Sequence, residues 1–381
     1  MRETNIDWIP NIPDNWDVVR LKDIAKLQSG EGITSDFIDE TGDYPVYGGN
    51  GLRGYTDIYT NDGDYVLIGR QGALCGNINY AKGKFYASEH AVVVYTHDKH
   101  ENTTWLGETL RMANFNRLSA SAAQPGLSVS VLNYQKIPYP PKEVRQRIGL
   151  YLDEKLSEID KRVSVLEKQC DAYTRLKKSI IHQAVTRGLN PNVPLKDSGI
   201  EWIGMIPEHW EELHLKNCVY INNGSDYKEI EVDDGYPVIG SGGIFAYASE
   251  KMYEGEVILL GRKGTIDKPL YYNGAFWSVD TMFYAIPKKN SYCKYLYYCA
   301  TRFPFGKIST ATALPSMTQK ELYQLPIMLP PLQEQQAIAT YLDEKCAKID
   351  AAVENIGKQI EASKRLKRAI INEAISGKTT L

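Results

Sequence analysis

Two kinds of hydrophobic pattern alternate along the chain. Residues 1–141 and 189–331 contain short apolar runs, such as residues 65–68 and 91–95, separated by glycine and by Asn-Gly or Asp-Gly pairs. Short apolar runs bounded by turn residues are typical of strands in a compact sheet. We therefore expect a β-rich α+β domain in each of the two long ranges.

The other two ranges, residues 142–188 and 332–381, follow Pro-Pro pairs and contain almost no glycine. Proline is well placed just before a helix begins. Apolar residues then recur at alternating steps of four and three, the spacing of a coiled-coil seam. The expected seam residues are Leu152, Leu156, Ile159, Val163 and Leu166 in the first helix, and Leu342, Ile349, Val353, Ile356 and Ile360 in the second.

Charge along these helices predicts their relative direction. Each helix begins with an acidic pair, at Asp153 and Asp343, and ends with basic residues that include Lys177 and Lys367. An antiparallel pair places acidic starts beside basic ends, whereas a parallel pair places like charges together. We therefore expect the two helices to pair with each other in antiparallel fashion.

The second half of the chain repeats the first at an offset of about 190 residues, which is far longer than a solenoid repeat. Residues 6–23 match residues 200–217 at eight of 18 positions, and residues 151–155 recur unchanged as residues 341–345. The predicted fold is α+β: two similar β-rich domains separated by an antiparallel two-helix coiled coil, with an internal pseudo-two-fold repeat.

Composition excludes several classes of protein. The six cysteines form no Cys-x-x-Cys pair, so a zinc ribbon or a disulfide framework is not expected. The first residues lack the apolar core of a signal peptide. No run approaches the ~18 apolar residues of a membrane helix. We expect a cytoplasmic protein without a membrane segment, a metal site or a cofactor.

The net charge of the chain is −3, and both predicted domains are acidic. Residues 1–140 contain 12 basic and 17 acidic residues, and residues 189–331 contain 13 and 16. A nucleic-acid-binding domain usually has a basic surface. If the domains bind DNA, the contacts must come from local basic patches or from partner subunits, and the isolated chain should bind DNA weakly.

The repeated motifs resemble those of one protein family. Each half opens with Trp-x-x-x-x-Pro-x-x-Trp, continues with a Tyr-Pro-Val-x-Gly turn and a Gly-Arg-x-Gly loop, and ends with Pro-Pro before a helix containing Tyr-Leu-Asp-Glu-Lys. In this order the motifs are similar to those of the specificity (S) subunits of type I restriction–modification systems. The resemblance covers essentially the whole chain.

The resemblance implies a function without catalysis by the chain itself. In that family, two target recognition domains each recognise one half of a bipartite, asymmetric site in double-stranded DNA. The helices set the spacing and dock two methyltransferase (M) subunits, through which restriction (R) subunits join. Half-sites about one helical turn apart, ~34–36 Å, require two domains held at a fixed separation.

Candidate DNA contacts lie in the repeated loops. Arg70 and Arg262 occupy the Gly-Arg-x-Gly loops, where arginine can bind guanine or phosphate, or stabilise the turn by a salt bridge within the domain. Because both copies have this arginine, phosphate is the better partner. The positions that differ between copies are candidates for base contacts: Gln71 and Lys263 in these loops, and Asn50 and Ser241 in the glycine-rich turns.

Residues 124–130 and 312–318 are small and polar, and are weaker candidates for DNA-facing loops. Two other functions remain open from the sequence. The chain could be a stand-alone DNA methyltransferase or nuclease, although the Asn/Asp-Pro-Pro-aromatic loop of adenine methyltransferases is missing. It could also be a coiled-coil scaffold whose acidic domains bind proteins or sugars.

Overall fold

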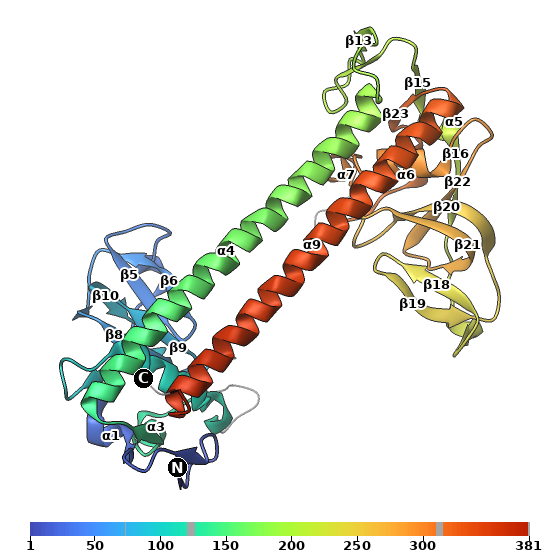
Figure 1. Ribbon diagram of the computed structural model, residues 1–381. Helices are drawn as coiled ribbons and strands as arrows, with labels where there is room; N and C mark the ends of the chain where they lie inside the picture. Colours follow the sequence, from blue (N-terminus) through green and yellow to red (C-terminus); the bar gives the residue numbers. More distant parts are fainter. Residues whose placement is uncertain (73, 120–125, 310–314, 380–381) are drawn as a thin grey trace. The chain divides into compact units, whose positions relative to one another are not determined.

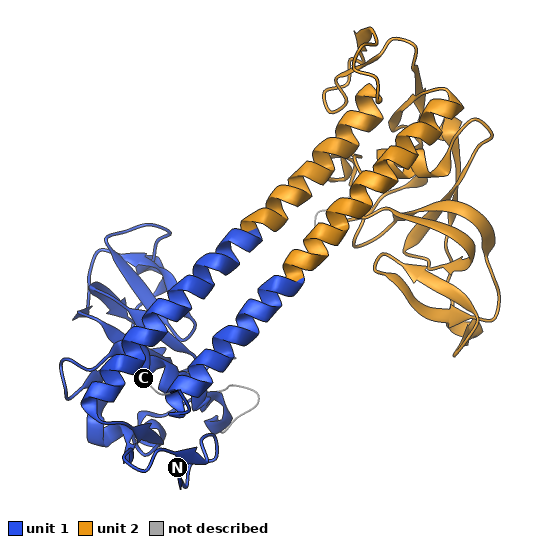
Figure 2. Ribbon diagram, viewed as in Figure 1, with its two compact units in different colours: residues 1–167, 358–381 blue, residues 168–357 orange. Residues whose placement is uncertain are grey.

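The computed structural model describes residues 1–72, 74–119, 126–309 and 315–379 (Figure 1). The chain divides into two compact units (Figure 2). Unit 1 comprises residues 1–167 and 358–381, and unit 2 comprises residues 168–357. Each unit contains a β-rich head and parts of two long helices, α4 (Lys142–Arg187) and α9 (Leu332–Ile375).

Both long helices end at a glycine in the left-handed region. Gly188 follows α4 with φ +71°, and Gly377 follows α9 with φ +69°. A residue with a side chain adopts this conformation at a cost, so glycine is the usual residue just after a helix. No helix in the described part of the chain combines the length and the apolar composition needed to span a bilayer.

The two helices run antiparallel within each unit. In unit 1, the first part of α4 lies beside the last part of α9, and Nζ of Lys367 is 2.6 and 2.8 Å from the carboxylate oxygens of Asp160. In unit 2, Nζ of Lys177 is 2.7 and 2.6 Å from those of Asp350. These two contacts join matched positions of the repeat, and they confirm the antiparallel arrangement predicted from charge.

The head of unit 1 consists of short strands and short helices. Its strands are β1 (Arg2–Glu3), β2 (Asn11–Ile12), β3 (Asp17–Arg20), β4 (Ala25–Ser29), β5 (Tyr44–Gly48), β6 (Gly51–Thr56), β7 (Asn61–Asp62), β8 (Tyr65–Gly69), β9 (Ile78–Ala81), β10 (Lys84–Ala87), β11 (Ala91–Thr96) and β12 (Lys136–Tyr139). Its helices are α1 (Leu21–Ile24), α2 (Thr103–Met112) and α3 (Val129–Asn133), with 3-10 turns η1 (Ser35–Phe37) and η2 (Phe115–Leu118).

The head of unit 2 has the same plan. Its strands are β13 (Leu195–Asp197), β14 (Met205–Pro207), β15 (Glu211–His214), β16 (Val219–Asn223), β17 (Glu231–Val232), β18 (Tyr236–Gly240), β19 (Gly243–Ala248), β20 (Tyr253–Gly261), β21 (Leu270–Ser278), β22 (Met282–Pro287) and β23 (Pro326–Leu329). Its helices are α5 (Leu215–Cys218), α6 (Cys293–Ala300), α7 (Phe305–Ile308) and α8 (Gln319–Tyr323), with the 3-10 turn η3 (Lys228–Ile230).

The central sheets of the two heads differ in continuity. Within the described residues, unit 1 has two four-stranded sheets, ordered β6-β5-β10-β7 and β4-β11-β8-β9. The described strands of unit 2 form one seven-stranded sheet, ordered β16-β22-β20-β21-β18-β19-β17. The nine-residue strand β21 pairs with both β20 and β18 and so joins the two halves of that sheet. In unit 1, the corresponding segment is broken at Gly83, which has φ +68°, into β9 and β10.

A continuous hydrophobic core fastens each head to both long helices. In unit 1, Trp16 and Trp105 of the head belong to the same buried cluster as Leu152 of α4 and Ile371 of α9. Unit 2 has an equivalent cluster that joins its head to α4 and α9. The burial of the head on the helices removes apolar surface from water, so each unit is held together by the hydrophobic effect.

Candidate nucleic-acid interface

The Gly-Arg-x-Gly loop of unit 1 follows the buried strand β8. The N–H of Arg70 donates to the carbonyl oxygen of His90 at 2.8 Å, and the N–H of Leu127 donates to that of Arg70 at 2.9 Å. Gly72, which closes the loop, has φ +88° and therefore requires glycine. These hydrogen bonds fix the loop backbone. The side chain of Gln71 is exposed and is therefore available to a ligand.

The glycine-rich turn of unit 1 lies against this loop. A Cβ atom on Gly69 would overlap the carbonyl oxygen of Gly49. The exposed Asn50 follows Gly49, and its Oδ1 accepts a hydrogen bond from Nδ2 of Asn77 at 3.4 Å. The structure therefore brings Asn50, Arg70 and Gln71, three of the predicted DNA contacts, to one edge of the head.

The loop of unit 2 is built in the same way. The N–H of Arg262 donates to the carbonyl oxygen of Thr281 at 2.8 Å, and the N–H of Met317 donates to that of Arg262 at 2.9 Å. The guanidinium of Arg262 is oriented by one backbone contact, in which Nη1 donates to the carbonyl oxygen of Asp280 at 3.3 Å. Its carbon also lies 5.7 Å from the centre of the Phe283 ring.

Neither loop arginine forms an ion pair within the described residues. The salt-bridge alternative for Arg70 and Arg262 therefore has no support in this structure. Lys263 is exposed, and Ser241 stands half-buried in the turn after β18. The end of β18 and the Arg262 loop both contact residues 278–281, since the N–H of Val279 donates to the carbonyl oxygen of Ile239 at 3.4 Å and that of Arg262 donates to Thr281.

The Tyr-Pro-Val-x-Gly motif is a strand, which corrects the expectation of a turn. Residues 44–48 form β5, which pairs with β6 and β10, and the turn itself is residues 49–50. The polar segments that were weaker candidates lie partly outside the described residues, at 124–125 and 312–314. Their described parts bond to the loops, because Gln71 pairs with Gly126 and Lys263 with Ser316.

One pair of matched residues beside these turns was not predicted from the sequence. Arg53 of β6 and Phe245 of β19 occupy equivalent positions. A Cβ atom on Gly48 would lie 2.5 Å from Cδ of Arg53, and one on Gly240 would lie 3.1 Å from Cε1 of Phe245. The glycine that ends each motif therefore makes room for this side chain, and that glycine was the signal in the sequence.

Seam residues of the long helices are buried to different degrees. Leu152, Leu156, Ile159, Leu166, Leu342, Ile349 and Ile356 are buried, whereas Val163, Val353 and Ile360 are half-buried. Because the helices also pack on the heads, the most buried seam residues, Leu152 and Leu342, lie where a head covers the seam.

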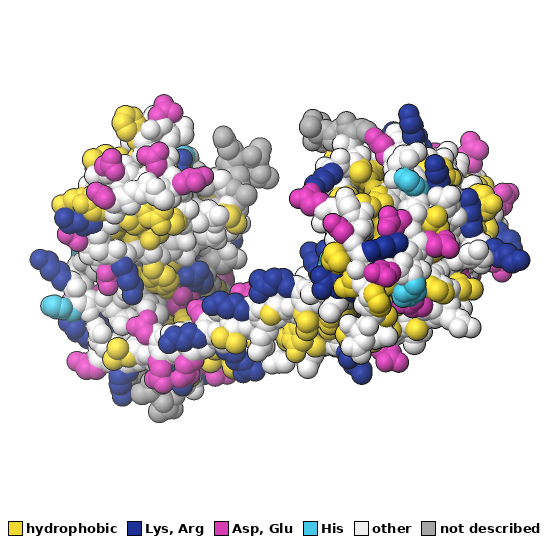
Figure 3. All heavy atoms as spheres, turned by 90° about the horizontal axis from the view of Figure 1, so that it is seen from above, with side chains coloured by type: hydrophobic (Ala, Val, Ile, Leu, Met, Phe, Trp, Pro, Cys, Tyr) yellow, Lys and Arg dark blue, Asp and Glu magenta, His cyan; other side chains and the backbone are white. Residues whose placement is uncertain are grey.

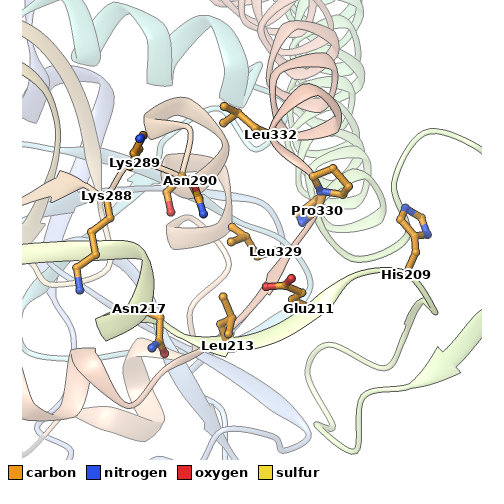
Figure 4. Close-up of a pocket in the computed structure, with 12 residues that line it drawn as sticks. His209, Glu211, Leu213, Asn217, Lys288, Lys289, Asn290, Leu329, Pro330 and Leu332 are labelled. Carbon is orange, nitrogen blue, oxygen red and sulfur yellow. The ribbon is translucent and has the colours of Figure 1, made fainter.

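A separate cavity of about 580 Å³ opens in unit 2 between β15, the segment after β22 and the start of α9 (Figure 4). The side chains of Lys288 and Lys289 point in different directions, so their charges do not converge (Figure 4). Nζ of Lys288 donates to the carbonyl oxygen of Lys216 at 2.6 Å, which gives it a structural role. The described residues contain no cluster of three His, Cys, Asp or Glu side chains suited to a metal ion.

Comparison with known protein families gives one match. The family described as type I restriction modification DNA specificity domain matches residues 13–167 and again residues 207–362. The two matches lie in the two halves of the repeat, and together they cover most of the chain.

Curated relatives are consistent with this match. A putative type I specificity subunit of Mycoplasma pneumoniae is 26% identical over 337 residues, which cover 85% of this chain and 87% of that protein. The EcoprrI specificity subunit of Escherichia coli is 42% identical over 138 residues. That alignment spans 35% of this chain and 34% of the Escherichia coli protein.

Solved structures share the fold. A chain from a study of the assembly and conformational transition of a type I restriction–modification system has a TM-score of 0.70 at 17% identity, with 97% of this chain and 100% of that chain covered. The specificity subunit from M. genitalium has a TM-score of 0.52 at 15% identity, with 98% of each chain covered.

Proposed function

The chain belongs to the type I restriction–modification DNA specificity family, and we propose that its two heads recognise the two halves of one bipartite site in double-stranded DNA. It is a specificity subunit of such a system. The observation that carries the proposal is that the specificity domain occurs twice, on heads whose candidate contact residues differ. Two different heads can recognise two different half-sites, so the site need not be a palindrome.

The repeat indicates which parts of the chain recognise DNA and which parts set the spacing. Residues 1–141 and 189–331 act as the two target recognition domains, and residues 142–188 and 332–381 form the helices that set the spacing. The helices dock two methyltransferase subunits, through which restriction subunits join. The chain itself supplies binding and no catalytic step, because sequence choice requires only a difference in affinity between DNA sites.

Within each head, two kinds of contact are proposed. Arg70 and Arg262, which are common to both heads, bind phosphate and set the position of the DNA. Residues that differ contact bases: Asn50 and Gln71 in unit 1, and Ser241 and Lys263 in unit 2. Asparagine and glutamine pair with adenine through two hydrogen bonds, whereas lysine prefers guanine.

A genome-wide map of N6-methyladenine in the host, with and without this chain, tests the proposal. We expect a bipartite motif with a fixed unspecified gap to lose methylation when the chain is deleted. Exchange of residues 1–141 for the corresponding domain of a relative should then change one half of the motif and leave the other half intact. An unchanged motif after this exchange would contradict the assignment of the heads.

A finer test uses the side chain over the motif glycine. Replacement of Arg53 by phenylalanine (R53F) gives unit 1 the residue found in unit 2. Arginine favours guanine, and phenylalanine can contact the methyl group of thymine. R53F should therefore relax or change one position in one half-site. A change in both half-sites would refute this role, and F245R in unit 2 is the matched variant for the other half.

A further inference from the structure

A basic cleft lies in unit 1 between helix α2 of the head and the paired helices α4 and α9. Its volume is about 820 Å³. Six basic residues line it: Lys82, Arg111, Lys161, Lys364, Lys367 and Arg368. Figure 3 shows Lys and Arg side chains gathered on the helical stretch beside the head of unit 1.

Three acidic residues also line the basic cleft, and each already has a partner. Asp160 pairs with Lys367, and Asp153 accepts a hydrogen bond from the hydroxyl of Thr104 at 2.5 Å. Glu108 accepts from the hydroxyl of Tyr80 at 2.8 Å and also pairs with Arg111. The carboxylates of the cleft are therefore already paired with other residues that line it.

Three basic residues of the cleft remain unpaired. Lys82, Lys161 and Arg368 are exposed and have no ion-pair partner among the described residues. The surrounding head is acidic, with 12 basic and 17 acidic residues in the first 140. A concentration of unpaired positive charge on an acidic domain creates a local potential that attracts a polyanion.

The matched cleft of unit 2 has a different charge. It lies between α6 and the same two helices, and its volume is about 430 Å³. Among the described residues that line it, Lys177, Lys178 and Arg302 are basic, and Asp343 and Asp350 are acidic. The fold therefore makes a cleft in both units, but six basic residues line the cleft of unit 1 and three line that of unit 2.

Substitutions at matched positions explain the difference. Thr174 in unit 2 corresponds to Lys364, and Thr301 corresponds to Arg111. Ala351 corresponds to Lys161. The backbone geometry does not require basic residues at these positions, because the equivalent helices form in unit 2 without them.

We propose that the basic cleft of unit 1 binds the phosphodiester backbone of the DNA. The inference rests on the proposed function and adds to it a contact that carries no base information. Ammonium and guanidinium groups bind phosphate oxygens and release counterions from the DNA, so such contacts strengthen binding to any sequence. Unit 1 thereby contributes more of the salt-dependent affinity than unit 2.

The test measures DNA affinity from 50 to 200 mM salt, with the full chain bound to its methyltransferase subunits. The triple variant K82Q/K161Q/R368Q removes the three unpaired charges. For three phosphate contacts, the slope of log affinity against log salt should fall in magnitude by about 2.7. The preference for the target found by methylation mapping should stay the same, because no base contact changes.

Two matched variants give the comparison. K26Q/K99Q/K136Q removes three exposed charges from the same unit outside the cleft, and it should change the slope less. T174K/A351K places lysines at the matched positions of unit 2, and it should increase the magnitude of the slope by up to about 1.8. An equal loss in the first control would overturn the inference, since overall charge would then explain the effect.

The outcomes separate the two proposals. An unchanged slope in the triple variant, with the target preference intact, overturns the basic cleft as a phosphate site and leaves the proposed function standing. Loss of methyltransferase subunits from the triple variant with an unchanged slope also overturns it, because the cleft would then bind protein. If the wild-type complex binds no DNA, both proposals fail.

Discussion

A buried ion pair fastens the head of unit 1 to the start of α4. Nε of Arg145 lies 2.9 and 3.0 Å from the carboxylate oxygens of Glu101, and the two side chains are 5% and 3% exposed. Nη1 of Arg145 donates to the carbonyl oxygen of Pro140 at 2.6 Å. The guanidinium carbon also lies 3.9 Å from the centre of the Tyr139 ring.

At the matched position of unit 2 the buried side chain is neutral. Gln335 replaces Arg145, and its Nε2 donates to the carbonyl oxygens of Asn290 at 3.0 Å and Pro330 at 2.8 Å. Its Oε1 accepts from the N–H of Tyr292 at 2.8 Å. The same joint can therefore be closed by a neutral amide.

Replacement of Arg145 by glutamine (R145Q) leaves the Glu101 carboxylate buried without a counter-charge. Breaking a buried pair in this way costs about 3–5 kcal/mol. For a unit of this size, a loss of 1 kcal/mol lowers Tm by about 2–4 °C, so the melting temperature of unit 1 should fall by roughly 6–20 °C. The double variant E101N/R145Q removes both charges and should recover most of the loss.

Calorimetry measures the two transitions, and hydrogen exchange in α2 assigns the shift to unit 1. The control is K367Q, which breaks the ion pair with Asp160 whose side chains are 32% and 59% exposed. An exposed pair contributes about 0–1 kcal/mol. The reasoning is refuted if R145Q costs no more than K367Q, or if the double variant is no more stable than R145Q.

Two further predictions concern pH and glycine. The pKa of His182 in α4 lies below its usual 6.5, because of burial and then of Arg302. As the pH falls below 6.5, the unfolded state binds the proton more readily than the folded state. Unit 2 should therefore lose stability below this pH, and H182Q should flatten the urea-unfolding profile against pH. A Cβ atom on Gly149 would overlap the side chain of Asn102, the N-cap of α2, so G149A should cost about 1–2 kcal/mol in chemical denaturation. Gly357 in α9 has open space at its Cβ position, and G357A should instead stabilise by about 0.5–1 kcal/mol. A pH profile unchanged by H182Q, or equal effects of the two alanine variants, would contradict these explanations.

The long helices could be predicted from the sequence because their signals are local. Heptad spacing and the acidic and basic ends gave the antiparallel pairing, and the contacts of Lys177 with Asp350 and of Lys367 with Asp160 agree with it. Likewise, the repeat predicts two heads of one plan, because it requires only a comparison of the two halves of the sequence. Periodicity is visible within each helix, and the pairing direction requires only a comparison of the charged ends of the two helices.

The assembly of the candidate interface could not be predicted, because it depends on pairing between distant segments. Gly49, Arg70 and Gly126 meet through backbone contacts that no local pattern encodes. The basic cleft is also non-local, since Lys82, Lys161 and Arg368 are far apart in sequence. Only the packing of the head on both helices places them around one cavity.

Unit 1 is built from both ends of the chain, and this has a consequence for protein synthesis. Its core joins Leu152 to Ile371, so the first head stays incomplete until the ribosome has added about 220 further residues. At ~5–20 residues per second this delay is roughly 10–45 s, during which apolar surface is open to chaperones and to aggregation. A premature stop codon within the final turns of α9 should therefore damage the head encoded first, and should leave the head encoded second nearly intact.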